Sequence, residues 1–225
     1  MNLVSSIYHN KFFESIFPTH VSVLKKELKD CQSVLDLGCG PDSPLQYCTN
    51  IKHSIGVAAF QPDLDVSKKK GIHSEYINKN IGELELEENS FDAVILMEVI
   101  EHMEENVGLE VLKKIEFWAR KKGIISTPNG FFPQKIVDKN PMQVHLSGWE
   151  TKKMKSLGFS KILGLAGLKY LRAEIDHDSM DAELFISMKY KPKFFWFIIA
   201  TLSQMFTYHF PNFAFGLFCV KTKGN

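Results

Sequence analysis

The stretch SVLDLGCGP, from Ser33 to Pro41, constrains the fold of this chain more than any other. A short apolar run contains the carboxylate of Asp36 and ends at Gly38 and Gly40, which carry no side chains. Glycines there let a ligand lie against the main chain, and a helix that follows would point free N–H groups at it. Glycine pairs also mark ordinary turns. In this context the stretch predicts a buried strand whose carboxyl end meets a ligand.

The rest of the chain alternates short apolar runs with segments long enough for helices, which is typical of a parallel α/β sheet. Strands are predicted at residues 33–38, 54–59, 73–78, 91–97, 122–127 and 214–221, and helices at 62–70, 106–120, 147–157 and 193–206. We expect one domain over residues 1–225. Residues 1–30 would form a leading helical cap, and residues 168–213 an irregular, partly helical insertion before the last strand.

The amino-acid composition limits the classes of protein to which this chain can belong. A formal net charge of +1 provides no overall field for nucleic acid. Four cysteines lack the spacing of metal knuckles and fit reduced intracellular thiols. Residues near the N-terminus form no uninterrupted apolar run, so no secretory signal is indicated and we expect a cytoplasmic protein.

Residues 194–220 contain no Asp, Glu, Lys or Arg. Their strongly apolar part, residues 194–202, is shorter than a bilayer requires. A helix followed by a closing strand accounts for this segment. The alternative is an apolar face that touches a membrane or a hydrophobic substrate.

The pattern of residues 33–41 resembles motif I of the class I S-adenosylmethionine (SAM) methyltransferases. The resemblance extends to residues 56–62, 91–94 and 127–130. It implies a Rossmann-like, mostly parallel sheet of seven strands, with helices on both faces and the ligand at the carboxyl ends of the strands. It also implies a set of SAM-contacting residues, namely Asp36, Gly38, Cys39, Gly40, Ala58, Phe60, Asn80, Ile81 and Met97.

Two positions depart from the family pattern. Ala58 stands where the family usually has an acidic residue that binds both ribose hydroxyls, and losing that contact should weaken affinity by about 1.5–3 kcal/mol. Asp63 or Asp65, in the next helix, could replace it. Asn80 stands where an aspartate usually faces the adenine amine, and its amide oxygen can still accept that hydrogen bond.

The sequence EVIEHM after the fourth predicted strand contains a second set of polar groups. If the chain turns helical there, Glu98, Glu101 and His102 lie on one side. Two carboxylates and an imidazole can hold a divalent cation, with His145 as a fourth ligand. The arrangement resembles the metal-dependent branch of the family, which includes small-RNA 3′-terminal 2′-O-methyltransferases and ubiquinone-pathway O-methyltransferases. The alternative is that these groups line the pocket or cap the helix without a metal.

These observations predict a SAM-dependent methyltransferase that acts on an oxygen of a small or lipid-like acceptor. His102, His145 and Glu98 are the candidate catalytic residues, because a neutral histidine can take the proton of a hydroxyl. RNA 2′-O-methylation is an alternative, opposed by the near-neutral charge and the lack of an added RNA-binding module, so nucleic acid is not expected as a partner. A non-catalytic binding or scaffold protein is a third reading, suggested by Ala58.

Overall fold

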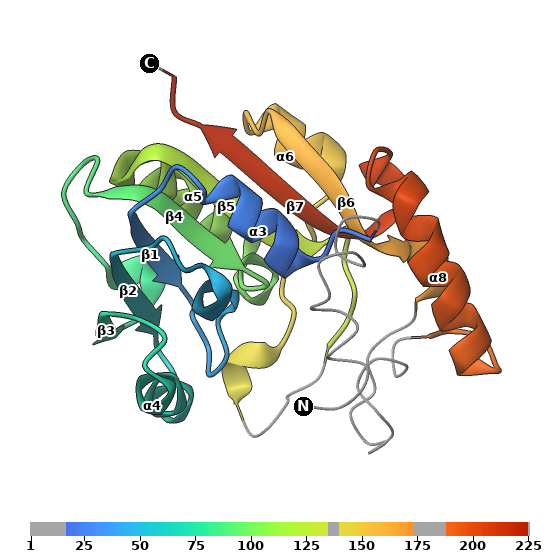
Figure 1. Cartoon of the computed structure of the whole chain (residues 1–225), viewed down its shortest axis with the longest axis horizontal. Coiled ribbons are helices and arrows are strands. Elements are labelled where there is room, and N and C mark those ends of the chain that lie inside the picture. Colours follow the sequence, from blue (N-terminus) through green and yellow to red (C-terminus); the bar gives the residue numbers. More distant parts are fainter. Residues whose placement is uncertain (1–16, 135–139, 173–187, 225) are drawn as a thin grey trace.

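The computed structural model describes residues 17–134, 140–172 and 188–224. A seven-stranded sheet in the order β3-β2-β1-β4-β5-β7-β6 runs through the molecule (Figure 1). Its strands are β1 (Ser33–Leu37), β2 (His53–Ala58), β3 (Glu75–Asn78), β4 (Phe91–Met97), β5 (Ala119–Pro128), β6 (Lys161–Leu168) and β7 (Ala214–Thr222). Strands β1 to β5 are parallel, whereas β7 runs antiparallel to both β5 and β6. The predicted Rossmann-like sheet is therefore confirmed.

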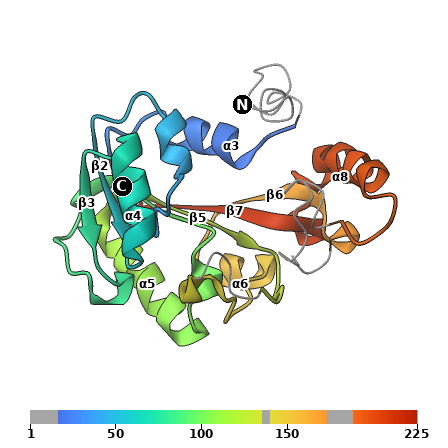
Figure 2. The ribbon, with the colours of Figure 1, turned by 90° about the horizontal axis from the view of Figure 1, so that it is seen from below.

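Helices cover both faces of the sheet (Figure 2). They are α3 (His20–Glu27), α4 (Gln61–Lys70), α5 (Glu105–Trp118), α6 (Thr151–Ser156) and α8 (Lys193–Thr207). Because strand side chains alternate between faces, Val34 joins the apolar layer under α3, while Leu35 and Leu37 join the layer under α5 and α6. Burial on both sides explains why the central strands read as nearly continuous apolar runs.

Helix boundaries follow local signals. Helix α4 has Pro62 in its first turn and ends at Gly71, whose φ of 63° is the left-handed conformation that favours glycine. Helix α5 ends two residues earlier than predicted, because β5 begins directly at Ala119. Of the apolar residues at helical spacing on α5, Val111, Ile115 and Trp118 are buried, whereas Val107 is 41% exposed.

The two chain segments outside the regular pattern are only partly described. Helix α3 occupies the described part of the predicted N-terminal cap, and residues 1–16 lie outside the described residues. The predicted insertion contains α8 and two short 3₁₀ turns, η5 (Lys169–Leu171) and η6 (Pro211–Phe213), while residues 173–187 are outside. No helix within the described ranges is both long enough and apolar enough to cross a membrane.

Candidate active site

The loop after β1 forms the floor of the larger of two adjoining pockets. Gly38 has a φ of 71°, and a Cβ there would lie 2.6 Å from Cγ2 of Val99, so the loop can pass this residue only as glycine. Gly40 is also left-handed, with a φ of 55°, but a Cβ there would meet nothing closer than a backbone oxygen at 4.0 Å. The space beside Gly40 is therefore left open for a ligand.

This first pocket has a volume of about 590 Å³, within the range typical of small-molecule sites. Six of the predicted SAM-contacting residues line it: Gly38, Gly40, Ala58, Phe60, Asn80 and Ile81. The other three lie elsewhere. Met97 packs against the apolar layer under α3, Cys39 is buried against Ala58 and Leu64, and Asp36 is buried in the strand below the loop.

Asp36 braces the glycine loop from within the protein. It accepts a hydrogen bond from the hydroxyl of Ser43, which stands just before the short turn η1 (Pro44–Tyr47). Its Oδ2 also lies 3.5 Å from Nε2 of His73. Burial raises the pKa of Asp36 to about 7 and lowers the pKa of His73 to about 4. Both groups are thus held in a dry site, where their neutral forms are favoured.

At the end of the pocket near β2, Ala58 occupies the position where the resemblance implies an acidic residue. Of the two predicted substitutes, Asp63 lines the pocket, and its Oδ2 accepts a hydrogen bond of 3.2 Å from Asn140. Asp65 instead accepts a 2.6 Å hydrogen bond from Gln61 on the exposed side of α4. The amide oxygen of Asn80 accepts a hydrogen bond from the backbone N–H of Gly82, which leaves it one further lone pair.

A second pocket, of about 200 Å³, adjoins the first. It lies at the carboxyl ends of β4 and β5, and its apolar wall includes Phe132 and Phe215, whose rings are 4.8 Å apart. Three residues line both pockets: Glu98, His102 and Gln143. The two pockets are therefore adjacent at these three side chains.

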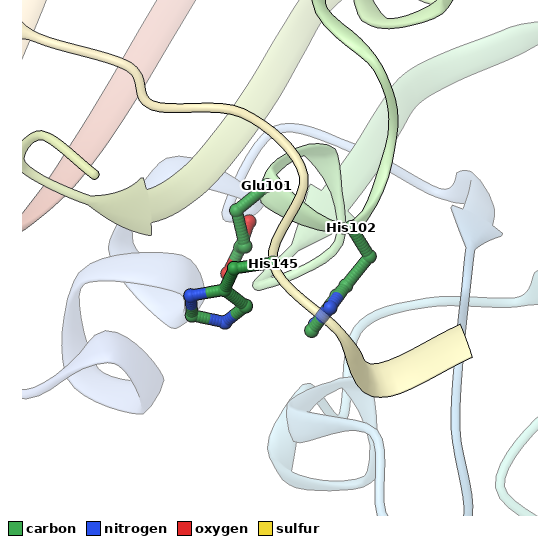
Figure 3. Close-up of side chains that lie close together, drawn as sticks. All are labelled: Glu101, His102 and His145. Carbon is green, nitrogen blue, oxygen red and sulfur yellow. The ribbon is translucent and has the colours of Figure 1, made fainter. Parts of the chain in front are cut away.

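Glu101, His102 and His145 converge at the second pocket (Figure 3). One ligand atom from each lies within 4.8 Å of the other two. The loop that carries His145 is tied to the Glu101 turn, because the N–H groups of Leu146 and Ser147 donate to the backbone oxygen of Glu101 at 2.7 and 3.1 Å. This tie brings together residues more than forty positions apart in the sequence.

Backbone carbonyls fix the orientation of both histidine rings. Nδ1 of His102 lies 3.2 Å from the oxygen of Val144, and Nδ1 of His145 lies 2.5 Å from the oxygen of Phe132. A carbonyl oxygen can only accept, so each Nδ1 carries the proton and each Nε2 keeps a lone pair. This is the arrangement in which histidines bind metals or accept protons.

The electrostatics of the group suit a cation or a proton acceptor. Burial, assisted by the negative charge of Glu98, raises the pKa of Glu101 well above its usual value. Glu101 Oε2 is buried without a hydrogen-bond partner in the described part of the chain. Burial lowers the pKa of His102 and of His145, so both rings are neutral at pH 7.

Glu98 stands apart from this group. Its φ of 54° is unusual for a residue with a side chain, and its N–H donates to the backbone oxygen and the hydroxyl of Ser126 at 3.0 and 3.1 Å. The helical turn starts later than predicted, with η3 (Ile100–His102). Glu98 Oε1 lies 3.6 Å from His20. Strain of this kind is found at functional sites, and Glu98 does border both pockets.

Sequence reasoning missed the parts of the site that distant segments provide. Gln143 reaches the junction of the pockets from the short 3₁₀ turn η4 (Pro141–Gln143), and no local pattern identifies it. Asn129 has a structural role, because its Nδ2 is 2.9 and 2.8 Å from the backbone oxygens of Pro211 and Ala214. Trp149 is fully buried, and its Nε1–H donates to the hydroxyl of Ser147 at 2.9 Å, so it anchors the segment before α6.

Comparisons with known proteins agree with this architecture. Residues 35–127 match a family model described as "Methyltransferase domain". The (S)-coclaurine N-methyltransferase of Thalictrum flavum subsp. glaucum is 30% identical over 110 residues, covering 45% of this chain and 29% of that protein. The match thus spans less than a third of that relative's length.

Two solved structures are similar over nearly their full lengths. The methyltransferase domain of bacterial CtHen1-CN has a TM-score of 0.55 and 18% identity, covering 90% of this chain and 97% of that one. A SAM-dependent methyltransferase from Archaeoglobus fulgidus has a TM-score of 0.54 and 17% identity, covering 94% of this chain and 98% of that one. At these identities the likeness concerns the fold.

Proposed function

Because this chain belongs to the class I SAM-dependent methyltransferases, we propose that it transfers a methyl group from SAM in the first pocket to an acceptor oxygen in the second. The observation that carries the proposal is the junction of the two pockets at Glu98, His102 and Gln143. Methyl transfer from a sulfonium is an in-line displacement, so donor and acceptor must meet end to end. Two adjacent pockets that share these three lining residues suit that requirement.

The residues of the first pocket would hold SAM through the backbone. Gly40 provides a side-chain-free surface for the methionine part, and Asn80 can accept a hydrogen bond from the adenine amine. We further propose that Asp63 binds the ribose hydroxyls in place of the residue missing at Ala58. Its position on the pocket wall supports this role, since a carboxylate is a strong acceptor for hydroxyl groups.

The second pocket has a donor set that fits a divalent cation. Glu101, His102 and His145 would hold it, and the buried, unpartnered oxygen of Glu101 supports this assignment. Glu98, the remaining ligand suggested by the sequence, lines the same pocket. A bound cation would lower the pKa of an acceptor hydroxyl.

The protein's own groups can also manage the acceptor proton. The Nε2 lone pairs of His102 and His145 are available because both Nδ1 atoms are engaged by carbonyls. Each ring is neutral at pH 7, so either can receive a hydroxyl proton as the methyl group is transferred. Because His102 lines both pockets, we expect its ring to be nearer to SAM than that of His145.

The lining of the second pocket favours a small or lipid-like acceptor, because Phe132, Pro133 and Phe215 offer apolar contacts beside the polar group. A 2′-hydroxyl of RNA is a second candidate, favoured by the convergence of Glu101, His102 and His145. All four cysteines are buried free thiols, which supports action in a reducing compartment such as the cytoplasm.

The test is SAM binding by calorimetry, followed by methyl transfer from labelled SAM to panels of phenols, lipid extracts, amines and small RNAs. Transfer to a hydroxyl of a small or lipid-like compound is the expected result. Transfer only to RNA ends would support the second candidate, and transfer to an amine would overturn the oxygen assignment. SAM binding without transfer to any panel would favour a non-catalytic role.

A further inference from the structure

Helix α8 covers the open edge of the sheet. Strand β6 is the last strand in the sheet order, and α8 lies next to its carboxyl-terminal end in both views (Figures 1 and 2). Gln204 accepts from the N–H of Gly167 at 2.9 Å and donates to the backbone oxygen of Gly164 at 3.2 Å. Ser203 accepts from the N–H of Leu168 at 3.0 Å. Polar side chains of α8 thus satisfy an edge that would otherwise expose backbone groups.

Glycines on β6 let the helix approach closely. A Cβ at Gly164 would lie 2.1 Å from the backbone oxygen of Thr207, and one at Gly167 would lie 2.1 Å from that of Ala200. The buried residues of α8 are accordingly small or polar: Ala200, Gln204 and Thr207. The side of α8 that contacts β6 therefore carries small and polar residues, while Trp196, Phe197 and Ile199 are partly buried against Leu171 and Met188.

The outward side of α8 is apolar. Its exposed residues, with exposed fractions between 40% and 64%, are Phe194, Phe195, Ile198, Leu202, Met205 and Phe206. The patch continues past the helix at Phe210 and Phe213, which are 53% and 43% exposed. At about 150–250 Å² for each ring, the phenylalanines alone expose on the order of 500 Å². Contiguous exposed patches of this size mark interaction surfaces.

Within the described residues, the charged side chains that directly precede this patch in the sequence are lysines. From Met188 to Gly224 the sequence has five lysines and no Asp or Glu, and two of the five, Lys221 and Lys223, lie at the far end of β7, where they pair with Glu116 and Glu88. Lys189 and Lys191 are exposed just before α8, and neither forms an ion pair with an acidic group in the described ranges. Lysines at a helix N-terminus oppose the helix dipole, so they do not serve to stabilise the helix. They complement a negatively charged surface next to the apolar one.

We propose that the outward side of α8 docks onto an anionic lipid bilayer, lying in its surface. Aromatic and aliphatic side chains would enter the acyl boundary, while Lys189 and Lys191 contact the headgroups. The rings of Tyr190, which stands between the two lysines in the sequence, and Trp196 lie 5.2 Å apart, and amphipathic rings of this kind favour a membrane interface. The helix is too short to span the bilayer, which agrees with a surface position.

The test is co-sedimentation of the full chain with phosphatidylcholine vesicles, with and without phosphatidylserine. We expect binding that requires phosphatidylserine and weakens with salt. The double variant Phe194→Ser, Leu202→Ser should lose at least about tenfold in partitioning. Lys189→Gln with Lys191→Gln should lose roughly tenfold or more. The matched control is Phe117→Ser, which changes a phenylalanine that is 48% exposed on α5.

Circular dichroism and Tm measurements establish that each variant is folded. Equal binding to both kinds of vesicle, or equal binding by the Phe194→Ser, Leu202→Ser variant and the control, would overturn the proposal. Absence of vesicle binding would also overturn it. If light scattering then showed self-association that the same double variant abolishes, the occupant would be a second copy of this chain.

Discussion

Replacing Asp63 with asparagine tests whether this residue binds the ribose of SAM. The change keeps the size of the side chain and its contact with Asn140, but removes the negative charge. A charge-assisted hydrogen bond contributes about 1.5–3 kcal/mol, which corresponds to roughly ten- to hundredfold in affinity. We therefore expect Asp63→Asn to raise the Kd for SAM by that factor in calorimetry.

Asp65→Asn is the matched control, since Asp65 lies on the same helix but bonds to Gln61 and does not line the pocket. Ala58→Asp restores the carboxylate at the family's usual position. It should tighten SAM binding by about tenfold in the native chain, and by more in the Asp63→Asn background, where no carboxylate competes for the hydroxyls. Equal affinities of Asp63→Asn and Asp65→Asn would refute the reasoning, and the ribose would then be held by another group.

Further predictions concern the loop, the polar group and the fold. Gly40→Val should weaken SAM binding at least tenfold, whereas Gly71→Val, with a similar φ and no atom within 4 Å, should impose comparable backbone strain without affecting binding in the same calorimetry. Glu101→Gln and His145→Ala should each abolish saturable Mn²⁺ binding measured by electron paramagnetic resonance, and unchanged binding would exclude the cation site. In the presence of a chelator, the free energy of unfolding should fall as the pH rises above 4.5, because the pKa of Glu101 is higher in the folded protein than in the unfolded chain. Urea titrations at several pH values should show this fall in the native protein and not in Glu101→Gln. Asn129→Asp places a carboxylate against backbone oxygens and should lower the free energy of unfolding by about 2–4 kcal/mol. Calorimetry should then find a Tm lower by roughly 5–15 °C, and an unchanged Tm would contradict the structural role.

The elements with strong local signals were predictable from the sequence. The glycine loop, the five parallel strands and the closing strand follow from apolar runs bounded by turn residues. Strand β6 was not identified from the sequence, because Gly164 and Gly167 interrupt its apolar pattern. These glycines allow helix α8 to approach the strand closely.

The site was predictable in its residue types but not in its geometry. His145 joins Glu101 only through backbone hydrogen bonds of the loop after residue 140, which no spacing rule encodes. Glu98 was expected on a helical face, but its left-handed backbone turns the chain before η3 begins. Asp63 could be named as a candidate from its place after β2, yet only the packed pocket distinguishes it from Asp65.

The position of β7 between β5 and β6 has a consequence for how the protein folds during its synthesis. Among the strands that the structure describes, β6 pairs only with β7, which the ribosome makes about fifty residues later. Until residues 214–222 emerge, β5 lacks its antiparallel neighbour and the apolar residues of β6 have no sheet to join. Pairing over such separations is slow, because the loop must close before the contacts form. Nascent chains halted before residue 214 should therefore have an open sheet edge at β5, and should engage chaperones until translation passes β7.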